Sequence, residues 1–376
     1  MKKLLFVLLV LGHSAFGQKN LPLIKASSIK VDIRDGEIFK KGGWNITPKL
    51  KPDIYATQNK NKKVTFYTDL DSISFVVIPN VQYDFVILLN NKDSALTRII
   101  YVPSYLETLK KADKYNKDDK RTVPGFTYQA SDNPNLVALK KNFKLDSIAG
   151  TGNEVSQILN LLHWMHNLVP HDGVHGNPNI MNATDMINVC KKDKRGLNCR
   201  GLAMALNECY LSLGFKSRYI TCLPKDSLGI DSDCHVINMV FSKSLNKWLW
   251  IDPTHDAYVM NEKGELLSVE EVRERLINNL PLILNPDANW NRKSSTLKEE
   301  YLYNYMAKNL YRLECPVSSE YNTETREKGK VISYIQLLPL DYFKQLPDYT
   351  EKKDEKSGTT FINFKTNNPY LFWAKP

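Results

Sequence analysis

Three residues that together can carry out acyl transfer occur in one stretch of the chain: Cys199, His235 and Asp252. Cys199 follows Asn198, whose side-chain oxygen can accept hydrogen bonds from the first free N–H groups of a helix. A thiol in the first turn faces the positive end of the helix dipole, which favours the thiolate. The sequence therefore predicts a nucleophilic cysteine at a helix start, where the same N–H groups point to a developing oxyanion.

His235 and Asp252 are predicted to be the partners of this thiol. His235 lies 235 − 199 = 36 residues after the cysteine, and Asp252 lies 252 − 235 = 17 residues further on. Two adjacent antiparallel strands can place an imidazole and a carboxylate side by side, which completes a thiol, base and carboxylate arrangement. Asp256 is a weaker alternative because no apolar strand precedes it, and His255 is expected at the surface.

The surrounding pattern predicts the elements that position these residues. Residues 155–168 carry apolar side chains at helical spacing, and a second helix over 198–213 ends at Gly214, a typical C′ glycine. The strand-like runs FKSRYITCL, CHVINMVF and KWLWIDPT follow, and then two helical runs, SVEEVRERLI and LKEEYLYNYMAKNLY, and a last strand, VISYIQLLPL. A helix followed by an antiparallel sheet predicts an α+β fold.

The segments GLNCRGLAMALNECYLSLGFKSRYI, DCHVINMVF and KWLWIDPT resemble the core of the transglutaminase-like superfamily, a branch of the papain-like cysteine enzymes. The resemblance covers about residues 195–256. It implies a cysteine-bearing helix packed on an antiparallel sheet, with Cys199 as nucleophile, His235 as base and Asp252 as the orienting carboxylate. One departure is that two residues separate Gly196 from the cysteine, where many members have one.

The reaction implied by this resemblance is attack on an amide carbonyl to form a thioester. Water as the second reactant makes the protein a peptidase or amidase, and an amine makes it a transglutaminase. Hydrolysis of peptide or protein amides, glycosylated substrates included, is the prediction, because an exported chain has access to water and the DSLGIDSD segment lacks the ligand order of a calcium loop. The alternatives are an amine-transferring transglutaminase and an inactive module that binds peptides or glycans.

Other residues are weaker candidates for this site. Asn198, Trp164 and His175 are candidates for substrate or oxyanion contacts, and His171 is expected to line the cleft or cap the preceding helix. A metal site is not predicted from the histidines over 163–175, because no HExxH motif and no carboxylate at ligand spacing accompanies them. No cofactor is predicted either.

The domain prediction has four parts. Residues 1–17 form a signal peptide, with Lys2 and Lys3 before an apolar run and cleavage after Gly17. Residues 18–103 are rich in β-branched and aromatic runs and predict a small β-sandwich-like domain. Residues 104–132 are expected to be a linker with a helix, and residues 133–376 the catalytic domain with a helical C-terminal extension.

Composition limits the location and the partners. The apolar run of the leader is shorter than the roughly 20 residues that span a bilayer, so the protein is predicted to be exported to the periplasm or the medium without stable membrane insertion. The charge of +10 is scattered among acidic residues, which does not favour nucleic-acid binding. Disulfides are possible in an oxidising compartment, but the spacing leaves open any pairing of Cys190, Cys209, Cys222, Cys234 and Cys315.

Overall fold

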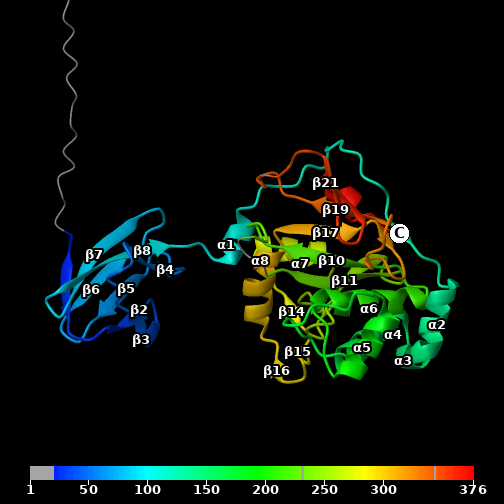
Figure 1. Cartoon of the computed structure of the whole chain (residues 1–376), viewed down its shortest axis with the longest axis horizontal. Helices are drawn as coiled ribbons and strands as arrows, with labels where there is room; N and C mark the ends of the chain where they lie inside the picture. Colours follow the sequence, from blue (N-terminus) through cyan, green and yellow to red (C-terminus); the bar gives the residue numbers. More distant parts are fainter. Residues whose placement is uncertain (1–20, 230–232, 343) are drawn as a thin grey trace, which may run out of the picture. The chain divides into compact units, whose positions relative to one another are not determined.

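The computed structural model describes residues 21–229, 233–342 and 344–376. The expected signal peptide, residues 1–17, lies outside the described residues. The chain is a mixed α and β protein that divides into two compact units, Met1–Pro103 and Ser104–Pro376 (Figure 1). Among the described helices, none is long and apolar enough to cross a membrane.

Within residues 21–103, two four-stranded sheets share one apolar core. Burial alternates along strands such as β2, because successive side chains of a strand point to opposite faces. The buried side chains include Val31, Ile33, Phe66, Phe85 and Ile87. One sheet has the order β1-β7-β8-β4, from β1 (Leu23–Ala26), β7 (Gln82–Leu89), β8 (Asp93–Tyr101) and β4 (Asp53–Thr57). The other has the order β3-β2-β5-β6, from β3 (Ile38–Asn45), β2 (Lys30–Asp35), β5 (Lys63–Tyr67) and β6 (Ser72–Val76).

The described part of Ser104–Pro376 is built on a seven-stranded sheet with the order β12-β11-β10-β17-β19-β21-β20. Its neighbours are antiparallel except for β19 and β21, which are parallel. The strands are β10 (Ser217–Leu223), β11 (His235–Ser242), β12 (Lys247–Ile251), β17 (Arg312–Pro316), β19 (Val331–Leu337), β20 (Tyr349–Lys353) and β21 (Thr360–Thr366).

The C-terminal part corrects the expected helical extension. After the helical segment η1 (Glu299–Met306) and α8 (Ala307–Asn309), the chain adds β17, β19, β20 and β21 to the sheet. The physical reason is that β17 pairs with the edge of β10, whose backbone groups would otherwise lack partners. The run VISYIQLLPL, expected as a last strand, is β19. The strands β17, β20 and β21 are the addition that the sequence did not predict, and β17 finds its partner β10 about 90 residues earlier in the chain.

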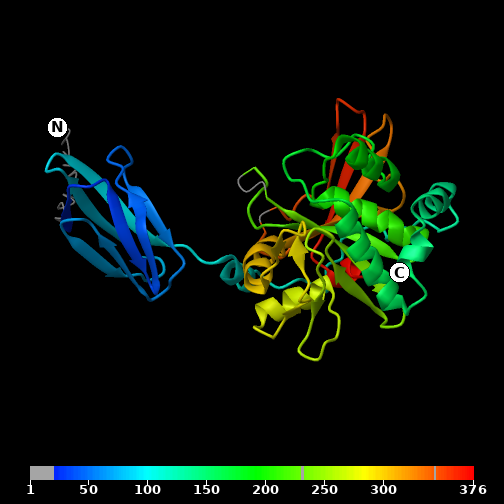
Figure 2. The same cartoon turned by 90° about the horizontal axis from the view of Figure 1, so that it is seen from below.

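Two sets of helices cover the two faces of this sheet. One set belongs to a core with Tyr219 and Val236, and its helices are α2 (Pro134–Phe143), α3 (Leu145–Ala149), α4 (Glu154–Leu168), α5 (Ala183–Asp193) and α6 (Cys199–Ser212). The other belongs to a core with Ile220 and Ile237, with η1, α8 and α7 (Val269–Ile277). Figure 2 shows the green helices of the first set and the yellow ones of the second on different sides of the unit.

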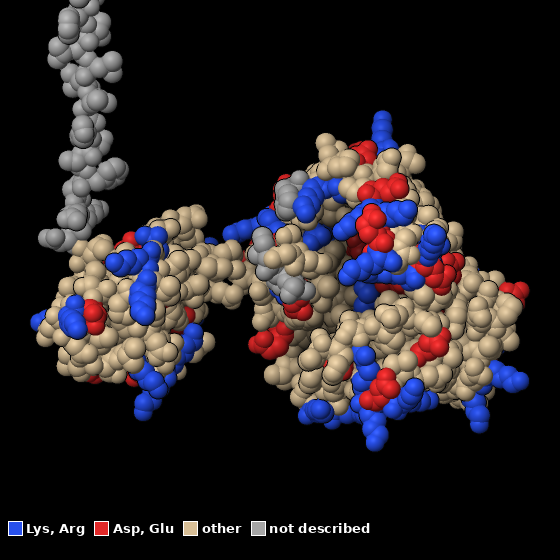
Figure 3. Space-filling model, viewed as in Figure 1, with Lys and Arg blue, Asp and Glu red and all other residues tan. Residues whose placement is uncertain are grey.

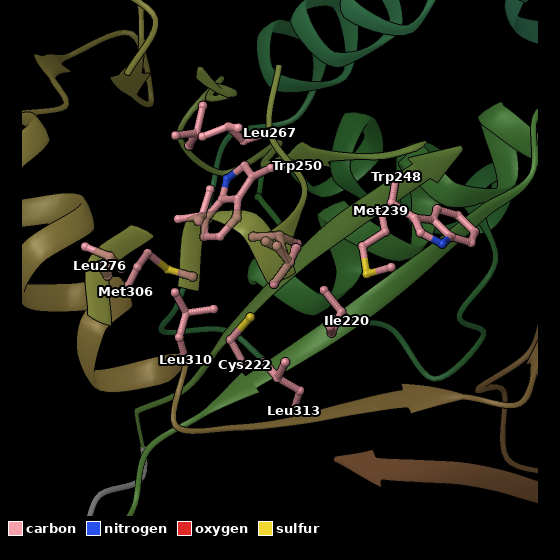
Figure 4. Close-up of a cluster of buried hydrophobic side chains, with 14 of the residues drawn as sticks. Ile220, Cys222, Met239, Trp248, Trp250, Leu267, Leu276, Met306, Leu310 and Leu313 are labelled. Atoms are coloured by element: carbon pink, nitrogen blue, oxygen red, sulfur yellow. The ribbon is translucent and has the colours of Figure 1, made fainter. Parts of the chain in front are cut away.

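The core around η1 and α7 covers one face of the strands that carry the site. Ile220 and Met239 alternate in sequence with residues of the opposite core, so every residue of β10 and β11 is buried. Trp250 of β12 lies in the same cluster as Leu276 and Met306 (Figure 4). Strands that are buried on both faces hold their backbone positions firmly, because any shift would disturb two close-packed layers.

The segment 104–132 differs from the expected linker. Its helix α1 (Tyr105–Lys110) buries Leu109 completely in the core. Its short strand β9 (Thr127–Tyr128) pairs in parallel with β18 (Ser318–Ser319). These contacts make the segment part of the larger unit. The remaining elements are β13 (Val259–Met260), β14 (Ile283–Leu284), β15 (Asn289–Trp290), β16 (Ser294–Ser295) and α9 (Pro369–Phe372).

Candidate active site

Cys199 is the first residue of α6, and two asparagines fix the start of this helix. Asn198 is the N-cap, and its Oδ1 accepts a hydrogen bond from the backbone N–H of Gly201 at 3.1 Å. The same oxygen accepts from Asn177 Nδ2 at 2.7 Å. A Cβ at Gly201 would lie 2.6 Å from Asn177 Oδ1, so glycine is what allows this close approach. These hydrogen bonds fix the first turn of α6 and therefore the position of Cys199.

His235 and Asp252 come together through the pairing of β11 and β12. His235 opens β11 and Asp252 directly follows β12, and His235 Nε2 lies 2.7 Å from Asp252 Oδ2. Both residues are at most 1% exposed. Asp252 Oδ2 also accepts from the Tyr301 hydroxyl at 2.5 Å, and its Oδ1 accepts from the backbone N–H of Thr254 at 2.8 Å. A carboxylate held in this way fixes the orientation of the imidazole through its Nε2 edge.

The opposite edge of the His235 ring, with Nδ1, is the edge available to Cys199. Hydrogen bonding between this imidazole and the Cys199 sulfur is one of the causes that lower the pKa of the thiol. Because His235 Nε2 lies against Asp252, Nδ1 is the ring nitrogen left for the sulfur. The sulfur also lies 4.0 Å from the backbone oxygen of Cys234. The structure thus brings together the three residues that the sequence predicts as nucleophile, base and carboxylate.

The electrostatics of these groups favour a thiolate and an imidazolium. Burial raises the pKa of Cys199, but hydrogen bonds to His171 and His235, the positive charge of His235 and the backbone N–H of Val236 hold it at about 6. Burial lowers the pKa of His235, and the neighbouring Asp252 charge more than offsets this and raises that pKa well above its usual range. Burial raises the pKa of Asp252, and the His235 charge outweighs burial and holds it below its usual range.

A cavity of about 610 Å³ opens beside this group. Its wall includes His171 and His235, the two imidazoles that lower the pKa of Cys199. The rest of the wall comes mainly from β15, β16 and η1, including Trp290, Glu300, Tyr301 and Tyr305. Aromatic rings with a few polar groups at their edges are typical of a substrate pocket.

His255 differs from its expected surface position. It lines the cavity, and its ring centroid lies 5.8 Å from that of His235. Its Nδ1 lies 3.0 Å from Thr296 Oγ1. Burial lowers the pKa of His255 to about 4 despite the Asp252 charge, so this imidazole is neutral at pH 7. Only its position three residues after Asp252 could have suggested a place near the site.

The structure does not bring Trp164 and His175 to the cavity. Trp164 faces α2, where its ring centroid lies 6.0 Å from that of Phe143. His175 is exposed, and its Nδ1 lies 2.7 Å from Asp172 Oδ2. The side-chain oxygen of Asn198 is engaged in the helix cap. These three side chains therefore have structural partners, whereas His171 lies both at the cavity and at the thiol.

The histidines of α4 have partners in the loop after Asp252. His163 Nδ1 lies 2.7 Å from Asp256 Oδ1, so this carboxylate is engaged by His163. In the described part of the chain, His163, Asp256 and Asp287 place their ligand atoms within 4.8 Å of one another, as do His235, Asp252 and His255. A metal bound by His235, Asp252 and His255 would have to displace the hydrogen bond between His235 and Asp252.

All six cysteines are free thiols in the described residues. Cys209, in the middle of α6, is completely buried, and burial raises its pKa well above the usual range. Burial also raises the pKa of Cys234 to about 11. Among the described cysteines, Cys199 is the one whose pKa is lowered, which separates it chemically from the others.

Comparisons with known proteins give little further information. A scan against models of protein families finds no match, and a search of curated proteins finds none. A search of solved structures finds a crystal structure from Cytophaga hutchinsonii that is provisionally described as a cysteine protease, at 18% identity and a TM-score of 0.26. The match covers 35% of this chain and 40% of that protein. Since such a likeness does not establish a shared fold, the function follows from the geometry of this chain.

Proposed function

We propose that the protein is a cysteine hydrolase of the transglutaminase-like type, which cleaves peptide or protein amides through a thioester. The observation that carries this proposal is the Cys199 thiol at a helix start, in contact with a buried His235 whose Nε2 lies 2.7 Å from Asp252. A nucleophile, a base and a group that orients the base are the parts that acyl transfer requires.

The proposed reaction begins with attack of the Cys199 thiolate on the amide carbonyl carbon. The electron pair of the carbonyl moves to oxygen, and the tetrahedral intermediate collapses to a thioester as the amine leaves with the proton of His235. His235, now neutral, takes a proton from water, whose oxygen attacks the thioester. Collapse releases the acid and restores the thiolate and the imidazolium. Asp252 holds the imidazole in place throughout and stabilises its charged form.

We also propose that the protein is exported. The support is the sequence of residues 1–17, with two lysines before an apolar run and small residues at its end. Its substrates would then be peptides or proteins outside the cytoplasm. Figure 3 shows basic and acidic side chains interspersed on the face in view of the larger unit, as expected for a protein whose substrate is not a polyanion.

The test is cleavage of a mixture of proteins in water enriched in ¹⁸O, with a labelled primary amine present. Hydrolysis predicts new carboxyl groups that carry ¹⁸O, and their loss in Cys199→Ala but not in Cys190→Ala, whose thiol is buried. Amine incorporation at glutamine without ¹⁸O uptake would instead identify an amine-transferring transglutaminase. If neither product forms and the protein binds peptides or glycans saturably, it is a binding module.

A further inference from the structure

Two imidazoles line the cavity and lower the pKa of the Cys199 thiol, and the proposed reaction uses only His235. The second is His171, which lines the same cavity and pairs through its backbone with Leu197, two residues before Cys199. Hydrogen bonding from His171 is one of the causes that lower the pKa of the Cys199 thiol. A group in contact with the attacking sulfur is also within reach of the substrate carbonyl, because the carbonyl carbon becomes bonded to that sulfur. His171 is therefore placed where it could act on the substrate carbonyl.

The backbone of His171 is tied to the segments on both sides of it. Its N–H donates to Asn291 Oδ1 at 2.6 Å, and its carbonyl accepts from Asn291 Nδ2 at 2.9 Å. On the other side, the N–H of Leu197 donates to the carbonyl of Pro170, and the N–H of Asp172 donates to the carbonyl of Leu197 at 2.7 Å. These bonds attach His171 to the segment that leads directly into Cys199.

The ring of His171 presents one nitrogen to the site. Its Nδ1 is buried and has no hydrogen-bond partner in the described part of the chain, so Nε2 is the nitrogen available to the thiol and the cavity. A buried N–H without a partner is rarer than a buried lone pair without one. A single ring proton is therefore favoured on Nε2, which makes His171 a hydrogen-bond donor towards the site.

We infer that His171 is a catalytic residue whose Nε2–H stabilises the oxyanion formed when Cys199 attacks the substrate carbonyl; the inference rests on the proposed function. In that step the sulfur–carbon bond forms and the carbonyl electron pair moves to oxygen. His171 donates a hydrogen bond to this oxygen. The hydrogen bond weakens when the electron pair of the oxygen re-forms the carbonyl and the leaving group departs. His235 alone exchanges protons, so the two imidazoles have separate roles.

The test compares two reactions of the same sulfur in the full-length protein. Acylation by p-nitrophenyl acetate passes through an oxyanion, whereas alkylation by iodoacetamide does not. His171→Phe retains an aromatic ring beside Trp290 but has no donor, and His171→Gln retains an N–H donor. Both rates are measured from pH 5 to 9 and compared at their plateaus, where the thiolate is fully formed.

The expected result is that His171→Phe slows acylation about 10²- to 10³-fold, the usual effect of losing one oxyanion donor, and changes the alkylation plateau less than about threefold. His171→Gln should recover at least about tenfold of the lost acylation rate. Equal slowing of both reactions, or no slowing of acylation, would overturn the role of His171. A wild-type Cys199 that iodoacetamide does not modify faster than the other thiols would instead overturn the proposed function, and this inference with it.

Discussion

The chemistry of the site depends on how each charged group is compensated. The Asp252 carboxylate is buried but accepts hydrogen bonds from His235, Tyr301 and Thr254. Burial of a charge without such partners would be costly. Because the carboxylate is fully compensated, it can hold His235 in its charged form, and His235 can in turn hold the Cys199 thiolate.

The low pKa of Cys199 predicts a characteristic pH profile. Lowering a thiol pKa favours the thiolate, so alkylation by iodoacetamide should rise through about pH 6 and remain flat above it. At pH 7 about 90% of this thiol would be ionised, against about 3% of an ordinary cysteine. His235→Ala should move the inflection upward by a unit or more. A wild-type inflection near the ordinary value of about 8.5 would contradict the thiolate and imidazolium pair.

Substitution of Asp252 tests the carboxylate. Asp252→Asn keeps the shape but removes the charge that raises the pKa of His235, so we expect the acylation rate to fall about 10²- to 10⁴-fold. The matched control is Asp256→Asn, because Asp256 faces His163 instead. Acylation by p-nitrophenyl acetate measures both variants. If the two substitutions have the same effect, Asp252 has no special role.

Turns and helix ends, more than the helices themselves, determine where the reactive side chains lie. Gly196 precedes the start of α6, and a Cβ there would lie 2.2 Å from the backbone oxygen of Pro170 and 2.8 Å from Asp172 Cβ. This close approach lets the segment with His171 run beside the one that leads into Cys199. Glycine is needed here for space, because its φ is not positive.

Gly196→Ala should therefore damage both stability and activity. We expect a loss of about 1–3 kcal/mol in the free energy of unfolding, typical of overpacking, and slower acylation because His171 is displaced. Gly176→Ala is the matched control from the same loop region, since a Cβ there meets no atom within 4 Å. Urea unfolding measures the first effect. Equal free energies of unfolding in the two variants would show that the segment with His171 and the segment before Cys199 can move apart without a loss of stability.

The molecule as a whole separates the candidate chemistry from the N-terminal β unit. The candidate triad, His171 and the cavity all belong to Ser104–Pro376. Each unit has its own buried core: one cluster lies in Met1–Pro103, and two clusters lie on the faces of the seven-stranded sheet. Units with separate cores are expected to fold independently.

A fragment of residues 104–376 should consequently fold and retain the reactive thiol. We expect cooperative thermal unfolding and an alkylation rate of Cys199 at pH 7 within about threefold of the full-length value, because no residue of the site comes from the β unit. Calorimetry and mass spectrometry of the alkylated fragment provide the measurements. Loss of folding in the fragment would show that the β unit stabilises the larger one.

Much of the site could be predicted from the sequence because its signals are local. An asparagine cap before an apolar helix places Cys199, and two strand-like runs place His235 and Asp252. These patterns act over a few residues, where periodicity and capping dominate. The run VISYIQLLPL likewise predicts the strand β19. The same patterns do not indicate β17, β20 and β21, because short strands owe their structure to distant partners.

The sequence by itself determined the chemical types at the site: a thiol at a helix start and a histidine and an aspartate at strand ends. The tertiary structure decided which other side chains join them. Among the side chains that the sequence offers for the cleft, it placed His171 at the cavity and directed Trp164 to α2. It also brought Tyr301, which the sequence did not indicate, to Asp252. The physical reason is that side chains from separate segments meet only when the two cores pack, and that packing depends on contacts across the whole unit.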